Sequence, residues 1–141
     1  MHAIKPSRPS WDTIWLQFAQ TIGCRSLDSK HKVGCVIISE DNTQVFAVGY
    51  NGDHKGGPNK RESDEVGKSG FIHAEINALI KCDYNTTKHK KMYLTLSPCD
   101  ICAKAIINAG IKEVIYAKKY KHGDGIKILQ NAGVNVRTFV E

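Results

Sequence analysis

The order in which helices and strands are predicted along this chain constrains its fold more than any other feature. Apolar residues at three- and four-residue steps predict helices, and short β-branched runs predict strands, in the order α-β-β-α-β-α-β-α-β. The first two strands, 33–39 and 44–50, are joined by a short polar turn and predict a β-hairpin. Helical crossovers make the later strands parallel, and helices must cover both faces of the sheet. We therefore predict an α/β fold, a three-layer α/β/α sandwich around a five-stranded mixed sheet.

The remaining elements follow one another without a linker or an internal repeat. Further strands are predicted at 92–97, 114–117 and 134–139, and helices at 11–23, near 72–80, from Pro98 to Gly110 and at 124–132. The segment 51–70 holds five glycines and a proline, which predicts a long loop of the kind that is usually functional or disordered. The length of 141 residues suits one domain, and we predict a single domain over residues 1–141.

The net charge of +6 leaves two interpretations open. The excess of lysine can be an ordinary solvated surface, or it can attract an anionic ligand. Residues 88–91 (KHKK) precede a predicted strand and are predicted to form an exposed loop. The sequence has no basic tail and no clear alternation of aromatic and basic residues, so we expect no nucleic-acid partner.

Hydropathy and cysteine content bear on the compartment. No apolar run approaches the roughly 20 residues that a membrane-spanning helix needs, and the first residues lack the apolar region of a secretion signal. We expect a soluble, cytoplasmic protein with no membrane partner. In a reducing compartment Cys24, Cys35 and Cys82 are predicted to be buried or half-buried free thiols. A second, structural zinc site that uses Cys24 or Cys82 with a histidine is the alternative, although no spacing supports it.

Two short motifs, HAE and PCDIC, carry most of the chemical information. They place His73 and Glu75 at the start of one predicted helix, and Cys99 and Cys102 on the first turn of the next. A three-residue step puts both sulfurs on one helix face, where thiols near a helix N-terminus are readily deprotonated. Three protein ligands leave the fourth tetrahedral position of a zinc ion open for water. We predict a catalytic Zn²⁺ bound by His73, Cys99 and Cys102.

Glu75 is the predicted catalytic residue of this site. Zinc lowers the pKa of bound water toward about 7, and Glu75 can take the proton while hydroxide attacks a ring carbon that bears an amino group. Glu75 can then return protons to the ring nitrogen and to the leaving ammonia. The order H-x-E followed by P-C-x-x-C is typical of zinc-dependent nucleobase deaminases. A CxxC pair alone would more often be structural or redox-active, and a closed zinc site would need a fourth protein ligand.

Beyond these motifs, the chain resembles the deoxycytidylate (dCMP) deaminases, especially the phage type, of the cytidine deaminase-like zinc superfamily. The likeness runs from Arg25 to the end and is carried by RSLDSKHKVGCVI, GYNG, HAEINALI, YLTLSPCDICAKAIINAGIKEVIY and LQNAGV. The resemblance implies hydrolytic deamination of dCMP to dUMP with release of ammonia, which supplies dUMP for thymidylate synthesis. It also implies a cytoplasmic location, in a host cell if a phage encodes the chain.

The resemblance further implies which residues hold the substrate. Asn51 of GYNG would bond the sugar hydroxyl, and backbone groups near Ala74 and Ser97 would read the cytosine edge. The 5′-phosphate would be held by Arg25, Ser26 and Tyr120. An arginine suits this role because its planar fork matches phosphate oxygens.

Regulation is a separate implication of the resemblance. Many members of the family are homohexamers that dCTP activates and dTTP inhibits with Mg²⁺, so a homohexamer with nucleotide effectors and Mg²⁺ is expected. The glycine-rich segment after GYNG resembles the effector-binding region, and its expected contacts are Gly52, Asp53, Lys55, Gly56 and Gly57.

Two other functions stay open at this point. A deaminase of a free nucleoside, or of a base in RNA or DNA, would use the same chemistry on a different cytosine substrate. Activity on dCMP but not on deoxycytidine would separate a nucleotide enzyme from a nucleoside enzyme. A non-catalytic zinc-binding module would keep the fold without the reaction, but Glu75 argues against it because a structural site needs no proton carrier.

Overall fold

The computed structural model describes residues 8–140 of the chain. The prediction that the N-terminus carries no secretion signal falls largely on residues 1–7, which lie outside the described residues. Within the described part, the elements follow in the predicted order. They are α1 (Trp11–Gly23), β1 (Gly34–Ser39), β2 (Val45–Tyr50), α2 (Ala74–Leu79), β3 (Lys90–Leu96), α3 (Asp100–Asn108), β4 (Glu113–Lys118), α4 (Gly125–Asn131) and β5 (Asn135–Thr138).

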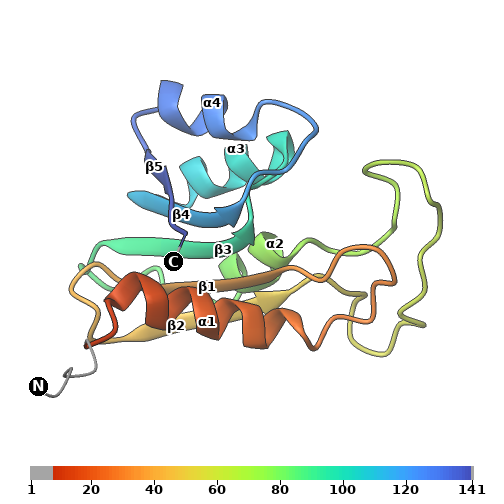
Figure 1. Ribbon diagram of the computed structural model, residues 1–141, viewed down its shortest axis with the longest axis horizontal. Helices are drawn as coiled ribbons and strands as arrows, with labels where there is room; N and C mark the ends of the chain where they lie inside the picture. Colours follow the sequence, from red (N-terminus) through yellow and green to blue (C-terminus); the bar gives the residue numbers. More distant parts are fainter. Residues whose placement is uncertain (1–7, 141) are drawn as a thin grey trace, which may run out of the picture.

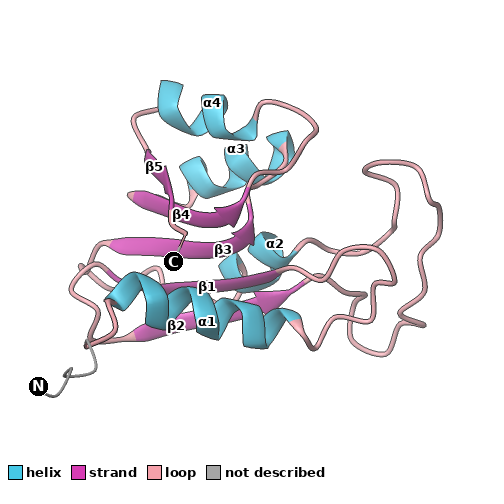
Figure 2. Cartoon of the chain, in the orientation of Figure 1, coloured by secondary structure: helices cyan, strands magenta, loops and turns pink. Residues whose placement is uncertain are grey.

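The strands form one mixed sheet in the order β2-β1-β3-β4-β5 (Figure 1). The hairpin strand β1 pairs antiparallel with both β2 and β3, whereas β3, β4 and β5 run parallel to one another. Helix α1 packs on one face, and α2, α3 and α4 lie on the other, so the sheet is the middle layer of a sandwich (Figure 2). The predicted α/β/α architecture with a five-stranded mixed sheet is confirmed.

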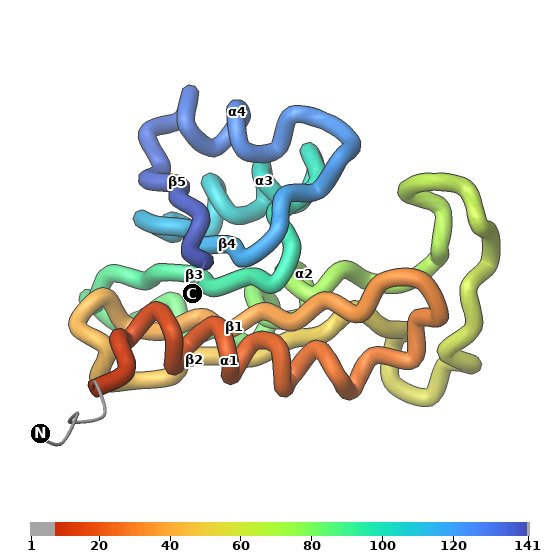
Figure 3. The backbone as a smooth tube through the Cα atoms, in the orientation of Figure 1, coloured from red at the N-terminus to blue at the C-terminus, as the bar shows by residue number. Residues whose placement is uncertain are grey.

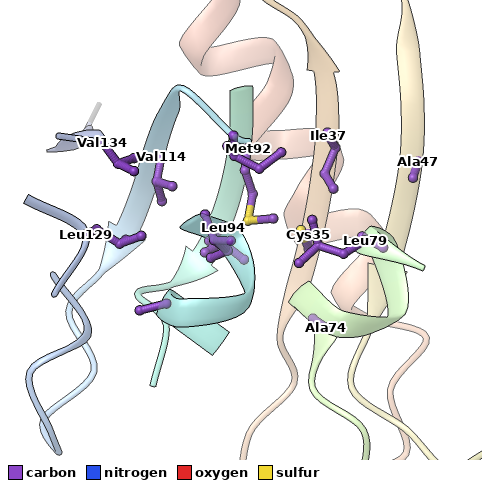
Figure 4. Close-up of a cluster of buried hydrophobic side chains, with 14 residues drawn as sticks. Cys35, Ile37, Ala47, Ala74, Leu79, Met92, Leu94, Val114, Leu129 and Val134 are labelled. Atoms are coloured by element: carbon purple, nitrogen blue, oxygen red, sulfur yellow. The ribbon is translucent and has the colours of Figure 1, made fainter. Parts of the chain in front are cut away.

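Alternate residues of the central strands feed two hydrophobic cores, as the two-residue period of a strand requires. Cys35, Ile37, Met92 and Leu94 point toward α2, α3 and α4, where Figure 4 shows them with Ala74 and Leu79. The intervening side chains Val36, Ile38 and Tyr93 pack against α1. Every residue of β1 is buried, because this strand is covered on both faces and paired on both edges.

Helix α1 approaches β1 so closely that Gly34 cannot carry a side chain. A Cβ atom there would overlap the carbonyl oxygen of Ala19 and lie 2.7 Å from the backbone nitrogen of Gly23. The helix begins at Trp11, as predicted, and Ser10 is its N-cap, whose hydroxyl accepts a hydrogen bond from the Thr13 amide. The close contact between α1 and Gly34 of β1 places the segment after α1, residues 24–33, at one end of the sheet.

One charge pattern was interpreted wrongly. Lys90 and Lys91 were predicted to lie in an exposed loop, but they open β3 and are 7% and 8% exposed. The Lys90 ammonium lies 5.3 Å from the ring centroids of both Phe46 and Tyr84, and Lys91 lies 5.6 Å from that of Tyr93. Cation–π attraction and burial of the aliphatic stems therefore hold both lysines against the protein.

The long loop 51–73 lies at the same end of the sheet as the segment 24–33. In Figure 3 both segments extend beyond the strands on the same side, the first in yellow-green and the second in orange. The loop is pinned at its ends by a bridge between Gly52 and Ile72. None of the helices among residues 8–140 combines the length and apolar character required to cross a membrane.

An ion-pair network ties α1 to the C-terminal strand and predicts a pH-dependent stability. The Arg137 guanidinium donates to both carboxylate oxygens of Asp12, at 2.7 and 3.0 Å, and Asp12 also accepts the Tyr93 hydroxyl at 2.6 Å. The hydrogen bond from Arg137 holds the pKa of Asp12 below its usual value of 3.8. Stability from a lowered carboxyl pKa is present above that value and is lost as pH falls through the folded-state pKa.

Arg137→Ala is therefore expected to lower the free energy of unfolding by roughly 1–2 kcal/mol at pH 7, since the bonded carboxylate loses its cation. The loss should shrink as pH falls below 3.8, where Asp12 becomes protonated in the unfolded chain, and should vanish below the lower folded-state pKa. Urea unfolding at pH 7 and pH 3 measures it, with Lys104→Ala on the exposed side of α3 as a charge-matched control. A loss of equal size at both pH values would contradict the assignment to Asp12.

Candidate active site

The two sequence motifs meet at the carboxyl end of β3, where α2 and α3 begin. His73 is the N-cap residue of α2 and Cys99 is the N-cap residue of α3. Pro98 was predicted to lie in the first turn of the helix, but it precedes the N-cap and lies two positions before Asp100, the first residue of α3. Crevices outside the carboxyl ends of parallel strands are the usual ligand sites of open α/β sheets.

His73, Cys99 and Cys102 form a compact cluster of metal-ligand atoms. The His73 Nδ1 atom lies 3.2 Å from the Cys102 Sγ and 3.5 Å from the Cys99 Sγ. One ligand atom from each of the three residues lies within 4.8 Å of the others. Thiolate sulfur and imidazole nitrogen are the donors of tetrahedral zinc sites, so this donor set fits Zn²⁺.

Electrostatics favour a thiolate in this cluster. A hydrogen bond from Cys102 and a weaker contribution from the hydrogen bond of His73 lower the pKa of Cys99 to about 4, against the effect of burial. The bond to Cys99 in turn raises the pKa of His73 and that of Cys102. Cys99 is thus the thiolate of the cluster, and a divalent cation within reach of both sulfurs would favour loss of the Cys102 thiol proton as well.

Glu75 lies in the first turn of α2 with only 4% of its surface exposed. Burial raises the pKa of its carboxyl group from 4.5 to about 7. A carboxyl group with such a pKa can both accept and release a proton near neutral pH, as general acid–base catalysis requires. It lines the same pocket as His73 and Cys99.

The pocket beside this cluster gathers several residues that the sequence singled out for substrate contacts. Asn51, Ala74, Ser97 and Tyr120 all line it. The Ser97 hydroxyl accepts a hydrogen bond from the Tyr120 amide at 2.7 Å. This bond holds the segment that follows β4 against the segment that follows β3. The Asn51 side chain accepts from the Val33 amide at 2.9 Å and donates to the His31 carbonyl at 2.7 Å. Its carbonyl oxygen keeps a second lone pair for a ligand.

Arg25 and Ser26, the two residues at the start of the RSLDSK segment that were expected to bind a phosphate, do not line the pocket. Arg25 is exposed and is not among the residues that line the pocket. Ser26 is 1% exposed, and its hydroxyl donates to the Asn51 carbonyl at 2.8 Å and accepts from the Asp28 amide at 3.2 Å. Ser26 therefore supports the backbone beneath the pocket.

The five residues expected to contact an effector lie at the start of the loop 51–73, and none of them lines the pocket. Asp53 and Asn59 exchange hydrogen bonds of 3.0 and 3.2 Å, which closes a small turn. Gly56 within this turn has a φ of +85° and Gly57 packs against the Asp53 carboxylate. Gly52 pairs with Ile72. The contacts to Gly52, Asp53, Lys55, Gly56 and Gly57 stay a prediction.

Sequence reasoning did not single out a group of charged residues at the outer part of the pocket. The group consists of Asp28, Lys30, Arg61 and Asp64, and His31 and His122 lie at the same pocket. The length and composition of the loop 51–70 were the available signal, because long loops in compact domains are usually functional.

The cysteines outside the cluster are free thiols. Cys35 is buried and Cys82 half-buried as predicted, but Cys24 is exposed because it follows the last turn of α1 on the surface. Among residues 8–140, the ligand atoms of His73, Cys99 and Cys102 are close enough to hold a metal ion, and neither Cys24 nor Cys82 belongs to such a group.

Comparison with known proteins finds the family described as "Cytidine and deoxycytidylate deaminase zinc-binding region", which matches residues 9–118. The deoxycytidylate deaminase of Saccharomyces cerevisiae is 35% identical over 94% of this chain, and the human deoxycytidylate deaminase is 34% identical over 92%. The match covers 80% of the human protein, but this chain spans just under half, 46%, of the yeast relative. The crystal structure of dCMP deaminase from cyanophage S-TIM5, in complex with dCMP and dUMP, superposes with a TM-score of 0.81. That protein is 30% identical, over 95% of this chain and all of its own.

Proposed function

Because this chain belongs to the family of cytidine and deoxycytidylate deaminases with a zinc-binding region, we propose that it hydrolyses dCMP to dUMP and ammonia. The observation that carries the proposal is the cluster of His73, Cys99 and Cys102, with His73, Cys99 and the buried carboxyl group of Glu75 lining one pocket. Relatives named deoxycytidylate deaminase and a structural neighbour in complex with dCMP and dUMP support the choice of substrate.

Zinc would be held by the His73 Nδ1 and the two sulfurs of Cys99 and Cys102. Bound there, it supplies a Lewis acid that lowers the pKa of water toward about 7. Glu75 accepts the first proton of the attacking water at a carboxylate oxygen and passes it to the ring nitrogen N3 as the oxygen adds to C4. Glu75 then moves the remaining hydroxyl proton to the leaving amino group, the C4–N4 bond breaks, and ammonia departs.

The pocket wall would hold the rest of the substrate. Asn51 keeps an acceptor lone pair for a sugar hydroxyl, and Ala74 and Ser97 lie next to the cluster, where backbone groups can read the cytosine edge. Tyr120 lines the pocket and its ring packs edge-on against His122, with centroids 5.4 Å apart.

The biological setting follows from the same proposal. The product dUMP would feed thymidylate synthesis, in the cytoplasm of the cell that expresses the chain. A homohexamer that responds to dCTP and to dTTP with Mg²⁺ stays a prediction from the family resemblance.

The proposal is tested by ammonia release from cytosine nucleosides and their mono- and triphosphates, measured with the zinc-loaded protein. We expect turnover of dCMP and little turnover of deoxycytidine. Equal turnover of both would indicate a nucleoside deaminase, and zinc binding without turnover of any of these compounds would indicate a non-catalytic module. Repeating the assay with dCTP and dTTP, each with Mg²⁺, tests the predicted regulation.

A further inference from the structure

The segment between β4 and α4, residues 119–124, forms part of the wall of the pocket. Tyr120 and His122 from this segment line the pocket together with His73 and Cys99. The segment contains no helix or strand, and in the described part of the chain the backbone of residues 119–123 makes no hydrogen bond to another backbone group. The position of this part of the wall therefore depends on contacts with side chains.

Two side chains on either side of Cys99 hold the segment near its ends. The Ser97 hydroxyl accepts a hydrogen bond from the Tyr120 amide at 2.7 Å. The Asp100 Oδ1 accepts one from the Asp124 amide, also at 2.7 Å. Asp124 is the N-cap residue of α4, so the bond to Asp100 also fixes where this helix begins beside α3 (Figure 1).

The backbone of the segment lies directly against Asp100. Gly123 has a φ of +79°, in the left-handed region that favours glycine, and a Cβ atom there would lie 2.5 Å from the Asp100 Oδ1. At Gly125, the first residue of α4, a Cβ atom would overlap the carbonyl oxygen of Pro98. The start of α3 and the start of α4 are therefore fitted to one another without room for further side chains.

Asp100 acts on the pocket from outside it. The residue is half-buried and does not line the pocket. Cys99 caps α3 with its own sulfur, which accepts from the Cys102 amide at 3.4 Å, and Glu75 lies on another helix, α2. Loss of the Asp100 carboxylate should therefore release the wall and leave the reacting groups in place.

We propose that Asp100 is a positioning residue for substrate binding, and that its carboxylate holds residues 119–124 so that Tyr120 and His122 form a preformed wall of the pocket. A wall that is ordered before the substrate arrives costs no conformational entropy on binding, whereas a released segment has to be ordered by the substrate. The proposal rests on the proposed function and deepens it, because it assigns part of the substrate affinity to a residue outside the pocket lining.

The test separates KM from kcat. Asp100→Ala should raise the KM for dCMP by roughly three- to ten-fold, with kcat within about two-fold of the wild type and the zinc content unchanged. Gly123→Ala disturbs the same contact from the other side and should raise the KM as well. Asp100→Asn keeps an acceptor oxygen in the same position, so its KM should stay within about two-fold of the wild-type value.

Asp124→Ala is the matched control. It removes a carboxylate from the other residue of the contact but leaves the backbone amide that Asp100 binds, and the Asp124 side chain is exposed and makes no cap hydrogen bond. Its KM for dCMP should equal that of the wild type. A rise in the KM of Asp124→Ala or Asp100→Asn as large as that of Asp100→Ala would overturn the proposal. An unchanged KM in both Asp100→Ala and Gly123→Ala, or a loss confined to kcat, would overturn it too.

Hydrogen exchange separates this proposal from the proposed function, because it needs no turnover. Without substrate, the amides of residues 119–124 should exchange faster in Asp100→Ala, by roughly ten-fold or more, and at the wild-type rate in Asp100→Asn and Asp124→Ala. Calorimetric titration should show weaker binding of dUMP by Asp100→Ala alone of these three variants. Wild-type protein that releases no ammonia from dCMP would refute the proposed function. The role of Asp100 would still hold if exchange were faster and dUMP binding weaker, and would fail if Asp100→Ala matched the wild type in both.

Discussion

Replacing Glu75 with glutamine is expected to leave zinc binding intact and to reduce the turnover of dCMP by roughly 10²–10⁴-fold. Glutamine has the shape and volume of glutamate, so it fits the buried position in the first turn of α2. It cannot accept a proton from water, and no carboxylate then serves N3 or the leaving amine. The measurements are single-turnover rates with dCMP and the zinc content of the purified variant.

Folding provides the control for this prediction. Burial raises the pKa of Glu75 to about 7, so ionisation of this carboxyl group opposes folding by an amount that grows as pH rises from its unfolded value of 4.5 to that pKa and persists in full above it. A neutral glutamine removes this cost, and the metal-free variant should melt at the same temperature as the wild type or higher at pH 8. Turnover at the wild-type rate would contradict the proton-transfer role of Glu75.

Replacing Cys102 with serine is expected to abolish both zinc retention and activity. Its sulfur lies 3.2 Å from the His73 Nδ1 and the residue is 2% exposed, so serine fits sterically but offers a poorer zinc ligand than a thiolate. A ligand that binds only the folded state raises its stability, so the melting temperature of the zinc-treated variant should fall below that of the wild type.

The matched control for Cys102→Ser is Cys24→Ser, which removes an exposed thiol outside the cluster. It should keep the wild-type zinc content, melting temperature and activity. Metal analysis after dialysis and thermal unfolding with and without zinc measure both variants. Retention of a full equivalent of zinc by Cys102→Ser would show that this sulfur is not a ligand.

The element order and most element bounds were predictable because their signals are local. Apolar spacing, the Ser10 cap and the glycines after helices lie within a few residues of the elements that they define. The neighbours of each strand were not predictable in this way. The apolar run of β1 is a local signal, but its position between β2 and β3 depends on pairing across the whole chain.

The side chains of the cluster were predictable for a related reason. The HAE and PCDIC motifs each fix a local geometry at a helix start, and one strand between them brings His73 and Cys99 to the same end of the sheet. Lys90 and Lys91 show the opposite case. Their charge indicated an exposed loop, whereas aromatic rings from other elements decide where they lie.

The group of charged residues at the pocket could not be predicted, because it depends on a contact between distant segments. Asp28 and Arg61 are 33 residues apart, and irregular backbone precedes both of them. The family resemblance made Arg25 a candidate, but a resemblance in sequence does not determine into which space a side chain points. Only the folded loop shows that Arg61 reaches the pocket.

The coordination of zinc tests the central claim most directly, and X-ray absorption at the zinc edge of the purified wild-type protein measures it. We predict two sulfur ligands at about 2.3 Å, one imidazole nitrogen at about 2.0–2.1 Å and a fourth light atom from solvent. The solvent ligand should be replaced or perturbed when a hydrated-pyrimidine analogue is added. A fourth ligand supplied by the chain, such as a third sulfur or a second imidazole, would contradict a zinc site with an open position for water.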